Sequence, residues 1–562
     1  MISKQTTINI SVATLLGFCF LPATCPGSSP NTSKVDRLFN QWDRNDSPGA
    51  AIVIVKDGAV VYQRGYGYAN LEHHIPITPT TLFDVASVAK QFTGLSAAML
   101  IDQGKLSLDD DIRKHLPDLP DFGKPITIAH LLHHTSGLRD WPETLSLSEV
   151  DMEGPITLEM ILEMVRRQRE LDFPPGEEHL YSNTGYNLLA AIVAKISGES
   201  FRAWTGKNLF QPLGMKHTQV RDDPAEIVPN IADPYAPGDE RKFHRVESQL
   251  AAQGSSSLLI SAEDMGKWLL NFETGRIGGK AALKLMQQPG KLNNGRKVDY
   301  GFGIGLGDYH GTPSITHGGG WAGFRSFVLS IPEKRFGVAI LGNAGSMDTQ
   351  GLAMKIADLY LGHSSDGSSP KSSAKPAKAT RKPDPASWER FLGTYRLGPG
   401  WLLTITRDGD QLMTQATHEE KFKMTPVSGT TFFVEAYGAA IEFAPDTSGA
   451  VNHLLYRGIK APKLSLPQLT PEDLAAYAGD YWSEELRVVG RLEIHDKQLA
   501  IHDRAGRWIH LLPTGNDHFD AEVGQFSLEF THDAGSPATE LKVSGGRVRN
   551  LRFTRAILPK HN

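Results

Sequence analysis

Cysteine is almost absent from this sequence: two occur among 562 residues, Cys19 and Cys25. Both lie within residues 1–27, where an early lysine precedes a mostly apolar run over residues 8–21 and then small residues, a pattern typical of a secretory signal peptide. Removal of this segment leaves a mature chain without cysteine, which excludes thiol nucleophiles, disulfides and cysteine-ligated metals. Covalent chemistry must then use oxygen or nitrogen.

A long hydrophobic run is also absent. The run over residues 8–21 is shorter than the roughly 20 residues that a membrane-spanning helix needs, so an uncleaved N-terminal anchor is the less favoured interpretation. The stretch PATC ending at Cys25 lacks the Leu-small-small pattern of a lipidation site. We expect a periplasmic or secreted protein with no lipid anchor at Cys25 and no stable membrane span after signal cleavage.

An excess of positive charge is absent too, since the net charge is −5. This excludes the basic surface typical of nucleic-acid-binding proteins, and we expect no nucleic-acid partner. The sequence leaves the oligomeric state open.

Strand patterns in residues 34–362 gather at the two ends of this block. Apolar, β-branched runs around Asp57-Gly58 predict one hairpin, and residues 323–343 predict another that turns at residues 332–335. The patterns between them are mostly helical, and a further helix is expected over residues 347–362. We therefore predict an α+β fold whose first and last strands share one antiparallel sheet, with a helical subdomain inserted between them.

Residues 363–385 are rich in Ser, Pro, Lys and Ala and have the composition of a solvated linker. The block that follows repeats itself. FLGTYRLGPGWLLTI from residue 391 resembles YAGDYWSEELRVVGRLEI from residue 477, and three shorter pairs follow at a constant offset of 87 residues. Coincidental β-patterning would not keep this offset, so we predict two tandem small all-β, barrel-like domains, residues 386–470 and 471–558.

The pattern Ser-x-x-Lys occurs three times, and two of the occurrences fall in residues 368–375 of the linker. The third, Ser87/Lys90, opens an apolar helical pattern, where positions i and i+3 share a face. A serine nucleophile needs an adjacent base, and lysine can serve only if burial or nearby cations lower its pKa. A capping serine beside a surface lysine is the alternative interpretation.

Two further motifs carry groups suited to catalysis. Tyr181 and Asn183 stand directly before a helical pattern, where a tyrosine near cations can shuttle protons and an asparagine amide can both donate and accept. His317 ends a strand pattern and is followed by Gly318, Gly319 and Gly320, which would let a substrate approach the backbone and leave N–H groups free for an oxyanion. We expect a cation-capable His317 to favour neutral Lys90. The alternatives are a packing tyrosine, a capping asparagine and an ordinary glycine turn.

A third motif, HLLHHTSGL, contains His130, His133 and His134. No acidic residue stands at the spacing that a zinc protease motif needs, so we interpret this stretch as stabilising a loop and predict no metal site.

Taken in order, Ser87-x-x-Lys90, Tyr181-x-Asn183 and His317-Gly318-Gly319 resemble the three motifs of serine β-lactamases and penicillin-binding proteins. The resemblance is closest to the class C β-lactamase-related branch and extends over residues 34–362. It implies a serine β-lactamase/transpeptidase-like domain in which Ser87 attacks a carbonyl and Lys90 and Tyr181 share the proton transfers.

The resemblance also implies the remaining roles. The N–H groups of Ser87 and Gly320 would form the oxyanion hole, Asn183 would position the substrate amide, and water would release the acyl group without a metal or cofactor. The sequence does not decide whether Lys90 or Tyr181 takes the first proton.

The third motif departs from the β-lactamase pattern, in which Lys-Thr/Ser-Gly binds a carboxylate. His317 and Gly318 replace the lysine and the hydroxyl residue, which weakens bidentate carboxylate recognition. Together with two β-domains, this pattern is similar to the three-domain D-aminopeptidases, in which a loop from the last β-domain can reach the active site. No such loop can be assigned from this sequence.

We therefore expect a secreted serine hydrolase that cleaves a small peptide, amide or ester, cell-wall-derived peptides among the candidates. D-aminopeptidase or D,D-peptidase activity is the first hypothesis, followed by an esterase and then a β-lactamase. The alternatives are a penicillin-binding sensor with very slow turnover and a protein whose β-domains bind cell-wall or apolar ligands.

Overall fold

A central antiparallel sheet organises the first part of the chain in the computed structural model. The structure describes residues 31–148, 150–239, 242–363, 385–417, 419–503, 506–533 and 535–556. The predicted signal peptide, both cysteines and nearly all of the predicted linker lie outside the described residues. The sheet has six strands, in the order β14 (Gly305–Tyr309), β15 (Thr312–Trp321), β16 (Phe324–Ile331), β17 (Phe336–Gly342), β1 (Ala50–Lys56) and β2 (Ala59–Tyr66).

Both predicted hairpins are confirmed. Strands β1 and β2 are joined by Asp57 and Gly58, whose φ angles of 52° and 83° give the two left-handed positions of a tight hairpin turn. Strands β16 and β17 are joined through the short turn Pro332–Lys334. Strand β1 pairs with β17, so the first and last strands share one sheet, as predicted.

Both faces of the central sheet are covered by helices. Ile52 and Ile54 of β1 pack in the same cluster as residues of α1 (Thr32–Phe39) and α11 (Thr349–Leu361), the predicted closing helix. Val53 and Val55, which alternate with them, face α9 (Ala262–Thr274). This alternation follows from the two-residue period of a strand, and it makes β1 apolar on both faces.

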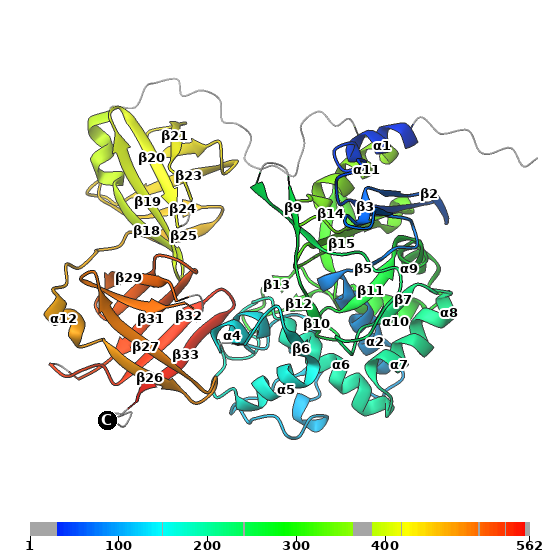
Figure 1. The fold of residues 1–562 in the computed structure, drawn as a ribbon, viewed down its shortest axis with the longest axis horizontal. Coiled ribbons are helices and arrows are strands. Elements are labelled where there is room, and N and C mark those ends of the chain that lie inside the picture. The colour runs from blue at the N-terminus through cyan, green and yellow to red at the C-terminus, as the bar shows by residue number, and fades with distance from the viewer. Residues whose placement is uncertain are drawn as a thin grey trace, which may run out of the picture.

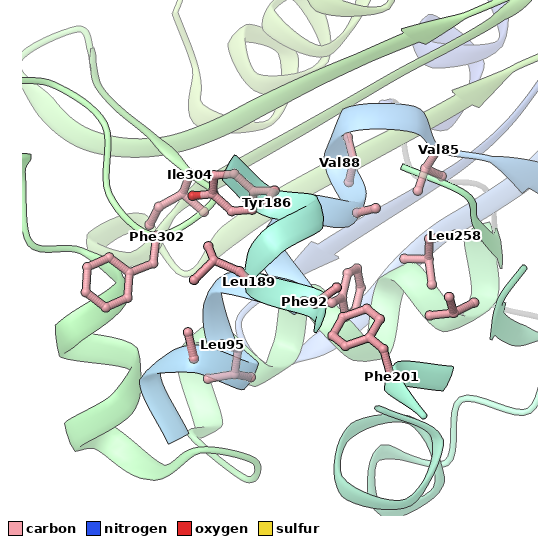
Figure 2. Packing of buried hydrophobic residues seen from close by; sticks show 14 of the residues in the cluster. Val85, Val88, Phe92, Leu95, Tyr186, Leu189, Phe201, Leu258, Phe302 and Ile304 are labelled. Atoms are coloured by element: carbon pink, nitrogen blue, oxygen red, sulfur yellow. The ribbon is translucent and has the colours of Figure 1, made fainter. Parts of the chain in front are cut away.

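The inserted subdomain is mostly helical, as predicted. Figure 2 shows Phe92 and Leu95 of the first long helix packed beside Tyr186 and Leu189 of the second. Its helices are α2 (Lys90–Asp102), α3 (Ile128–Leu132), α4 (Trp141–Leu147), α5 (Leu158–Arg167), α6 (Asn183–Ser197), α7 (Phe201–Thr205), α8 (Gln211–Leu213) and α10 (Gly279–Met286). Short strands connect them: β3 (Tyr68–Asn70), β4 (Ile75–Pro76), β5 (Leu82–Asp84), β6 (Pro155–Thr157), β7 (Thr218–Val220), β8 (Tyr235–Pro237), β9 (Phe243–Arg245), β10 (Gln249–Ala251), β11 (Leu258–Ser261), β12 (Gly290–Lys291) and β13 (Lys297–Val298).

Two β-domains follow, drawn in yellow and in orange to red in Figure 1. The first is an eight-stranded sheet of β18 (Gly393–Gly398), β19 (Trp401–Asp408), β20 (Gln411–Ala416), β21 (Phe422–Pro426), β22 (Thr431–Val434), β23 (Ala439–Pro445), β24 (Val451–Tyr456) and β25 (Ile459–Pro462). After α12 (Pro471–Ala475), the second forms a closed barrel of β26 (Gly479–Ser483), β27 (Val488–His495), β28 (Gln498–His502), β29 (Trp508–Gly515), β30 (His518–Ala521), β31 (Phe526–Thr531), β32 (Glu540–Gly545) and β33 (Val548–Arg555).

The repeat seen in the sequence is structural. Tyr395 and Tyr481 occupy equivalent positions in the first strands of the two β-domains, and both are fully buried. Each hydroxyl donates a hydrogen bond of 2.8 Å to the carbonyl oxygen four residues earlier, that of Phe391 or Tyr477. In both copies the buried tyrosine therefore links the residues that precede the first strand to the sheet. This shared feature confirms the prediction of two tandem barrel-like domains.

The closed barrel docks on the inserted subdomain near α4 (Figure 1). The guanidinium of Arg139 and the carboxylate of Glu485 form a buried ion pair, with Nη1 and Oε1 2.8 Å apart. The β32–β33 hairpin adds a pair between Arg549 and Glu178 at 2.9 Å. These contacts fix the closed barrel, its β32–β33 hairpin included, against the inserted subdomain. None of the described helices is long and apolar enough to cross a membrane.

Candidate active site

Ser87 lies in a short 3₁₀ turn, Ala86–Ala89, between strand β5 and helix α2. The sequence placed it in the first turn of a helix, and the structure places it in the turn that leads into that helix. Ala86 has φ 46°, a left-handed conformation that is unusual for alanine. Its N–H donates 2.8 Å to Oδ1 of Asp84, a carboxyl whose pKa is raised by burial to about 6. Asp84 thus holds the turn that presents Ser87.

Lys90 is fully buried and its Nζ has three oxygen neighbours. These are Oδ1 of Asn183 at 2.7 Å, the carbonyl oxygen of Ser255 at 2.8 Å and Oγ of Ser87 at 3.1 Å. Burial lowers the pKa of Lys90 well below its usual value, the carboxylate of Asp140 opposes this effect, and the guanidinium of Arg547 adds to it. The balance of these effects shifts Lys90 toward its neutral form.

A neutral lysine amine has two N–H donors and one lone pair. Asn183 Oδ1 and the Ser255 carbonyl can only accept, so they take the two N–H groups. The lone pair then faces Oγ of Ser87, whose O–H is the group left to donate. This arrangement is the one a serine needs to lose its proton on attack.

Asn183 begins helix α6 and is held by Asp140, the N-cap residue of α4. Its Nδ2 donates 2.9 Å to Oδ2 of Asp140, and its backbone N–H donates to Oδ1. These bonds fix the amide so that Oδ1 points to Lys90. Burial raises the pKa of the Asp140 carboxyl, and the guanidinium of Arg547 opposes this rise.

Tyr181 lies next to Lys90, with Nζ 4.9 Å from the centre of its ring. Burial raises the pKa of Tyr181, and the neighbouring Ser87 hydroxyl partly offsets the rise, so the phenol keeps its proton at neutral pH. Within the described chain, its buried Oη has no hydrogen-bond partner of ordinary geometry. The protonated hydroxyl of Tyr181 is therefore available to donate a hydrogen bond to a substrate atom near Ser87.

His317 corrects one prediction. Burial and the neighbouring Lys90 lower the pKa of His317 to about 3, so it is neutral and is not the cation that the sequence led us to expect. Its Nδ1 lies 2.7 Å from the carbonyl oxygen of Gly318, which can only accept, so the ring proton is on Nδ1. Nε2 then accepts from the hydroxyl of Tyr300 at 2.8 Å.

The three glycines after His317 differ in their surroundings. A Cβ on Gly319 would lie 2.1 Å from the carbonyl oxygen of Val85 and 2.3 Å from Oγ of Ser326, whereas on Gly318 or Gly320 it would meet only contacts of 3.6 Å or more. Gly319 therefore lets β15 pack directly on the segment that carries Ser87. Gly320, whose N–H the family resemblance assigns to the oxyanion hole, follows on the same strand.

Arg547 reaches this site from the last domain. It lies in the two-residue turn of the β32–β33 hairpin, and its Nη1 is 2.8 Å from Oδ2 of Asp140. Its Nε and Nη2 each lie 3.0 Å from Oε1 of Glu143, and the guanidinium is 5.5 Å from the ring centre of Tyr181. The last domain thus supplies one wall of the region around Tyr181.

The structure brings together the predicted Ser87, Lys90, Tyr181 and Asn183, with His317 and its glycines alongside. Sequence reasoning missed Asp140, Ser255, Tyr300 and Arg547. The Gly545-Gly546 pair before Arg547 marks a turn, but nothing in the sequence indicates which surface that turn meets.

The interpretation of His130, His133 and His134 as loop-stabilising is confirmed. Nδ1 of His130 accepts from the backbone N–H of Thr127 at 3.1 Å, and Nδ1 of His134 accepts from that of Ser182 at 3.2 Å. His133 hydrogen-bonds through Nδ1 to the carbonyl oxygen of Tyr300 at 2.9 Å. Each ring is used to hold backbone around the site.

The fold and its relatives define the class of protein as a serine hydrolase. Residues 35–361, more than half of the chain, match the family described as Beta-lactamase, and residues 377–470 match a domain of unknown function, DUF3471. The chain therefore belongs to the beta-lactamase family.

Relatives share most of its length. A protein of Gluconobacter oxydans (strain 621H) named D-aminopeptidase is 26% identical over 537 residues, covering 91% of this chain and 96% of that protein. Penicillin-binding protein 4* of Bacillus subtilis (strain 168) is 27% identical over 441 residues, covering 75% and 95%. The octameric penicillin-binding protein homologue from Pyrococcus abyssi shares the fold, with a TM-score of 0.56 at 23% identity, covering 84% of this chain and 98% of that one.

Proposed function

We propose that this chain is a secreted or periplasmic hydrolase that cleaves small peptides or amides through an acyl-enzyme on Ser87, with D-aminopeptidase activity as the first expectation. The observation that carries the proposal is the environment of Lys90, in which two fixed acceptors take the N–H groups and the lone pair is left for the Ser87 hydroxyl.

Lys90 is the first base in this proposal. Ser87 Oγ attacks the substrate carbonyl carbon and its proton passes to Lys90 Nζ, which becomes an ammonium. The oxyanion is held by the N–H groups of Ser87 and Gly320, as the family resemblance implies. Lys90 can accept the proton because its pKa is lowered, whereas the raised pKa of Tyr181 makes the tyrosinate a poor resting base.

Tyr181 delivers the proton to the leaving group. Its Oη donates to the departing nitrogen and is reprotonated from the Lys90 ammonium, so that the C–N bond breaks and a Ser87 ester remains. Water then attacks the ester carbonyl, losing its proton to Lys90, and Ser87 leaves as the hydroxyl when that proton returns. Asn183 would hold the substrate amide close to these groups.

The charges around the site support a substrate without a carboxylate at this position. His317 is neutral, and Arg547 is already paired with Asp140 and Glu143, so neither is free to bind a substrate carboxylate. This favours an aminopeptidase over a D,D-carboxypeptidase or β-lactamase. The relative named D-aminopeptidase also aligns along nearly its whole length, the β-domains included.

We further propose that the chain works as three units, residues 34–362, 386–470 and 471–558, and that the last one shapes the substrate site. The contacts of Arg547 and Glu485 with the catalytic domain support this division of roles.

The test is release of p-nitroaniline from D- and L-alanine p-nitroanilide by the wild-type protein and Ser87→Ala. We expect release from the D-form alone and none by the variant. Release from neither form would remove the aminopeptidase proposal, and D,D-dipeptides, esters and a β-lactam would then be assayed in the same way. A stoichiometric burst with a β-lactam and no turnover would favour the penicillin-binding alternative.

A further inference from the structure

A cluster of metal-ligating side chains lies on the closed barrel, away from the catalytic residues. In the part of the chain that the structure describes, one group of three such residues has ligand atoms within 4.8 Å of one another: His495, Asp496 and His510. His495 ends β27, Asp496 begins the turn to β28, and His510 lies on β29 (Figure 1 labels β27 and β29). We propose that this cluster is a binding site for a Zn²⁺-class divalent transition metal.

The strand register explains why the two imidazoles meet. Strand β28 lies between β27 and β29, and its Ala500 pairs with Glu493 on one side and with His510 on the other. Ala500 is fully buried. Because its side chain is only a methyl group, His495 and His510 can contact each other across the intervening strand.

The spacing of the ligand atoms matches a tetrahedral ion. Nδ1 of His495 lies 3.2 Å from Nε2 of His510 and 3.5 Å from Oδ2 of Asp496. Zinc binds imidazole nitrogen and carboxylate oxygen at about 2.0–2.2 Å, so the edge of its coordination tetrahedron is roughly 3.3–3.5 Å. The Asp496 side chain is 78% exposed in the turn. Its carboxylate can therefore move to the same spacing from Nε2 of His510, which is the third pair of ligand atoms.

The surroundings orient the His495 ring and place a carboxylate near the His510 ring. The His495 ring stacks on Trp508, with centroids 4.3 Å apart and planes 16° apart. Nδ1 of His510, the nitrogen opposite its ligand atom, lies 3.9 Å from Oε2 of Glu522. At 3.9 Å these two atoms are not hydrogen-bonded, so Glu522 places negative charge near the His510 ring but does not fix its orientation. Each neutral ring would keep its proton on the nitrogen that does not face the ion.

The ligand set selects the metal class. Two imidazoles and one carboxylate suit Zn²⁺, Cu²⁺ or Ni²⁺ rather than Mg²⁺ or Ca²⁺, which prefer oxygen. Three protein ligands leave a fourth position for water. The sequence analysis predicted no metal site, and residues 495 and 510 do not have the spacing of a recognisable zinc motif.

The test is equilibrium dialysis of the full, untagged chain against Zn²⁺ with excess Mg²⁺, with the bound zinc counted per chain. We expect His510→Gln to bind one zinc fewer than wild type, and Asp496→Asn, in an exposed turn, to bind the same ion at least tenfold more weakly.

His502→Gln is the matched control. His502 also packs on Trp508, with ring centroids 3.5 Å apart, but it is not one of the three ligands, so zinc binding should be unchanged. Equal zinc counts and affinities for wild type, His510→Gln and Asp496→Asn would overturn the proposal. An equal loss in His502→Gln would also overturn it, because that loss would reflect damage to the Trp508 face rather than removal of a ligand.

Discussion

Arg547 and Asp140 form an ion pair in which Nη1 and Oδ2 are 2.8 Å apart, although Arg547 lies in the β32–β33 hairpin and Asp140 directly precedes helix α4. Asp140 also accepts two hydrogen bonds from Asn183, whose Oδ1 accepts from Lys90. One chain of polar contacts therefore runs from the last domain to the proposed base. Through this connection the β-domain acts electrostatically on Lys90, because the guanidinium of Arg547 lowers the pKa of that lysine.

Replacement of Arg547 by alanine tests that influence. We expect kcat/KM to fall about 10- to 100-fold, because a hydrogen bond to a charged group is worth about 1.5–3 kcal/mol. The guanidinium lowers the pKa of Lys90, so its loss should also move the acidic limb of the pH–kcat/KM profile to higher pH. The measurement is a pH profile of D-alanine p-nitroanilide hydrolysis.

Arg549→Ala is the matched control for that experiment. Arg549 lies in the same hairpin, and its side chain pairs with Glu178 near the surface rather than with Asp140. The control should keep the wild-type pH profile. An identical shift in both variants would mean that hairpin docking, and not the charge of Arg547, sets the profile.

Replacement of Tyr181 by phenylalanine separates the two proton transfers. An anilide nitrogen must be protonated to leave, whereas p-nitrophenolate leaves without a proton. We expect Tyr181→Phe to reduce kcat on D-alanine p-nitroanilide by about 10²–10⁴-fold, the usual range for general acid catalysis, and to reduce kcat on the p-nitrophenyl ester far less. Equal losses on both substrates would instead make Tyr181 the base for attack by Ser87.

Gly319 should tolerate no side chain. Its added Cβ would lie 2.1 Å from the carbonyl oxygen of Val85, a backbone atom two residues before Ser87. We expect Gly319→Ala to destabilise the fold by about 1–3 kcal/mol, as overpacking does, and to lower kcat/KM. Gly318→Ala, whose Cβ meets only ordinary contacts, should leave the stability unchanged. The measurements are thermal unfolding of both variants and the kinetics of Gly319→Ala. Equal stability of the two variants would show that β15 does not pack directly against the backbone before Ser87.

The sequence was sufficient to predict those features that depend on a local pattern. The Asp57-Gly58 turn, the apolar strands around it and the serine-lysine spacing are each set by neighbouring residues, and all appear in the structure. The repeat was also readable, because Tyr395 and Tyr481 occupy matching places in two copies of one unit.

Groups brought together by docking could not be predicted. Arg547 reaches Asp140 only because the closed barrel packs beside α4, and no local pattern encodes that contact. The charge of His317 was misjudged for a similar reason. Its neutrality depends on burial and on the neighbouring Lys90, which lies in a different part of the chain.

The neutrality of His317 makes stability depend on pH. Its pKa is about 3 in the folded protein and about 6.5 in an unfolded chain. The unfolded state therefore binds more protons below pH 6.5, so stability is full above that pH and falls on acidification by up to about 1.4 kcal/mol per pH unit for this group. Buried His134, whose pKa is also lowered, adds to the loss.

We expect His317→Gln to lose less stability than wild type between pH 7 and pH 5, by up to about 2 kcal/mol, even if it is less stable at both. The glutamine oxygen can still accept from Tyr300 and does not titrate. Urea unfolding of the catalytic domain at the two pH values measures the difference. His73→Gln, at an exposed position, should match the wild-type loss. If His317→Gln lost as much unfolding free energy as wild type between pH 7 and pH 5, His317 would not be buried in its neutral form.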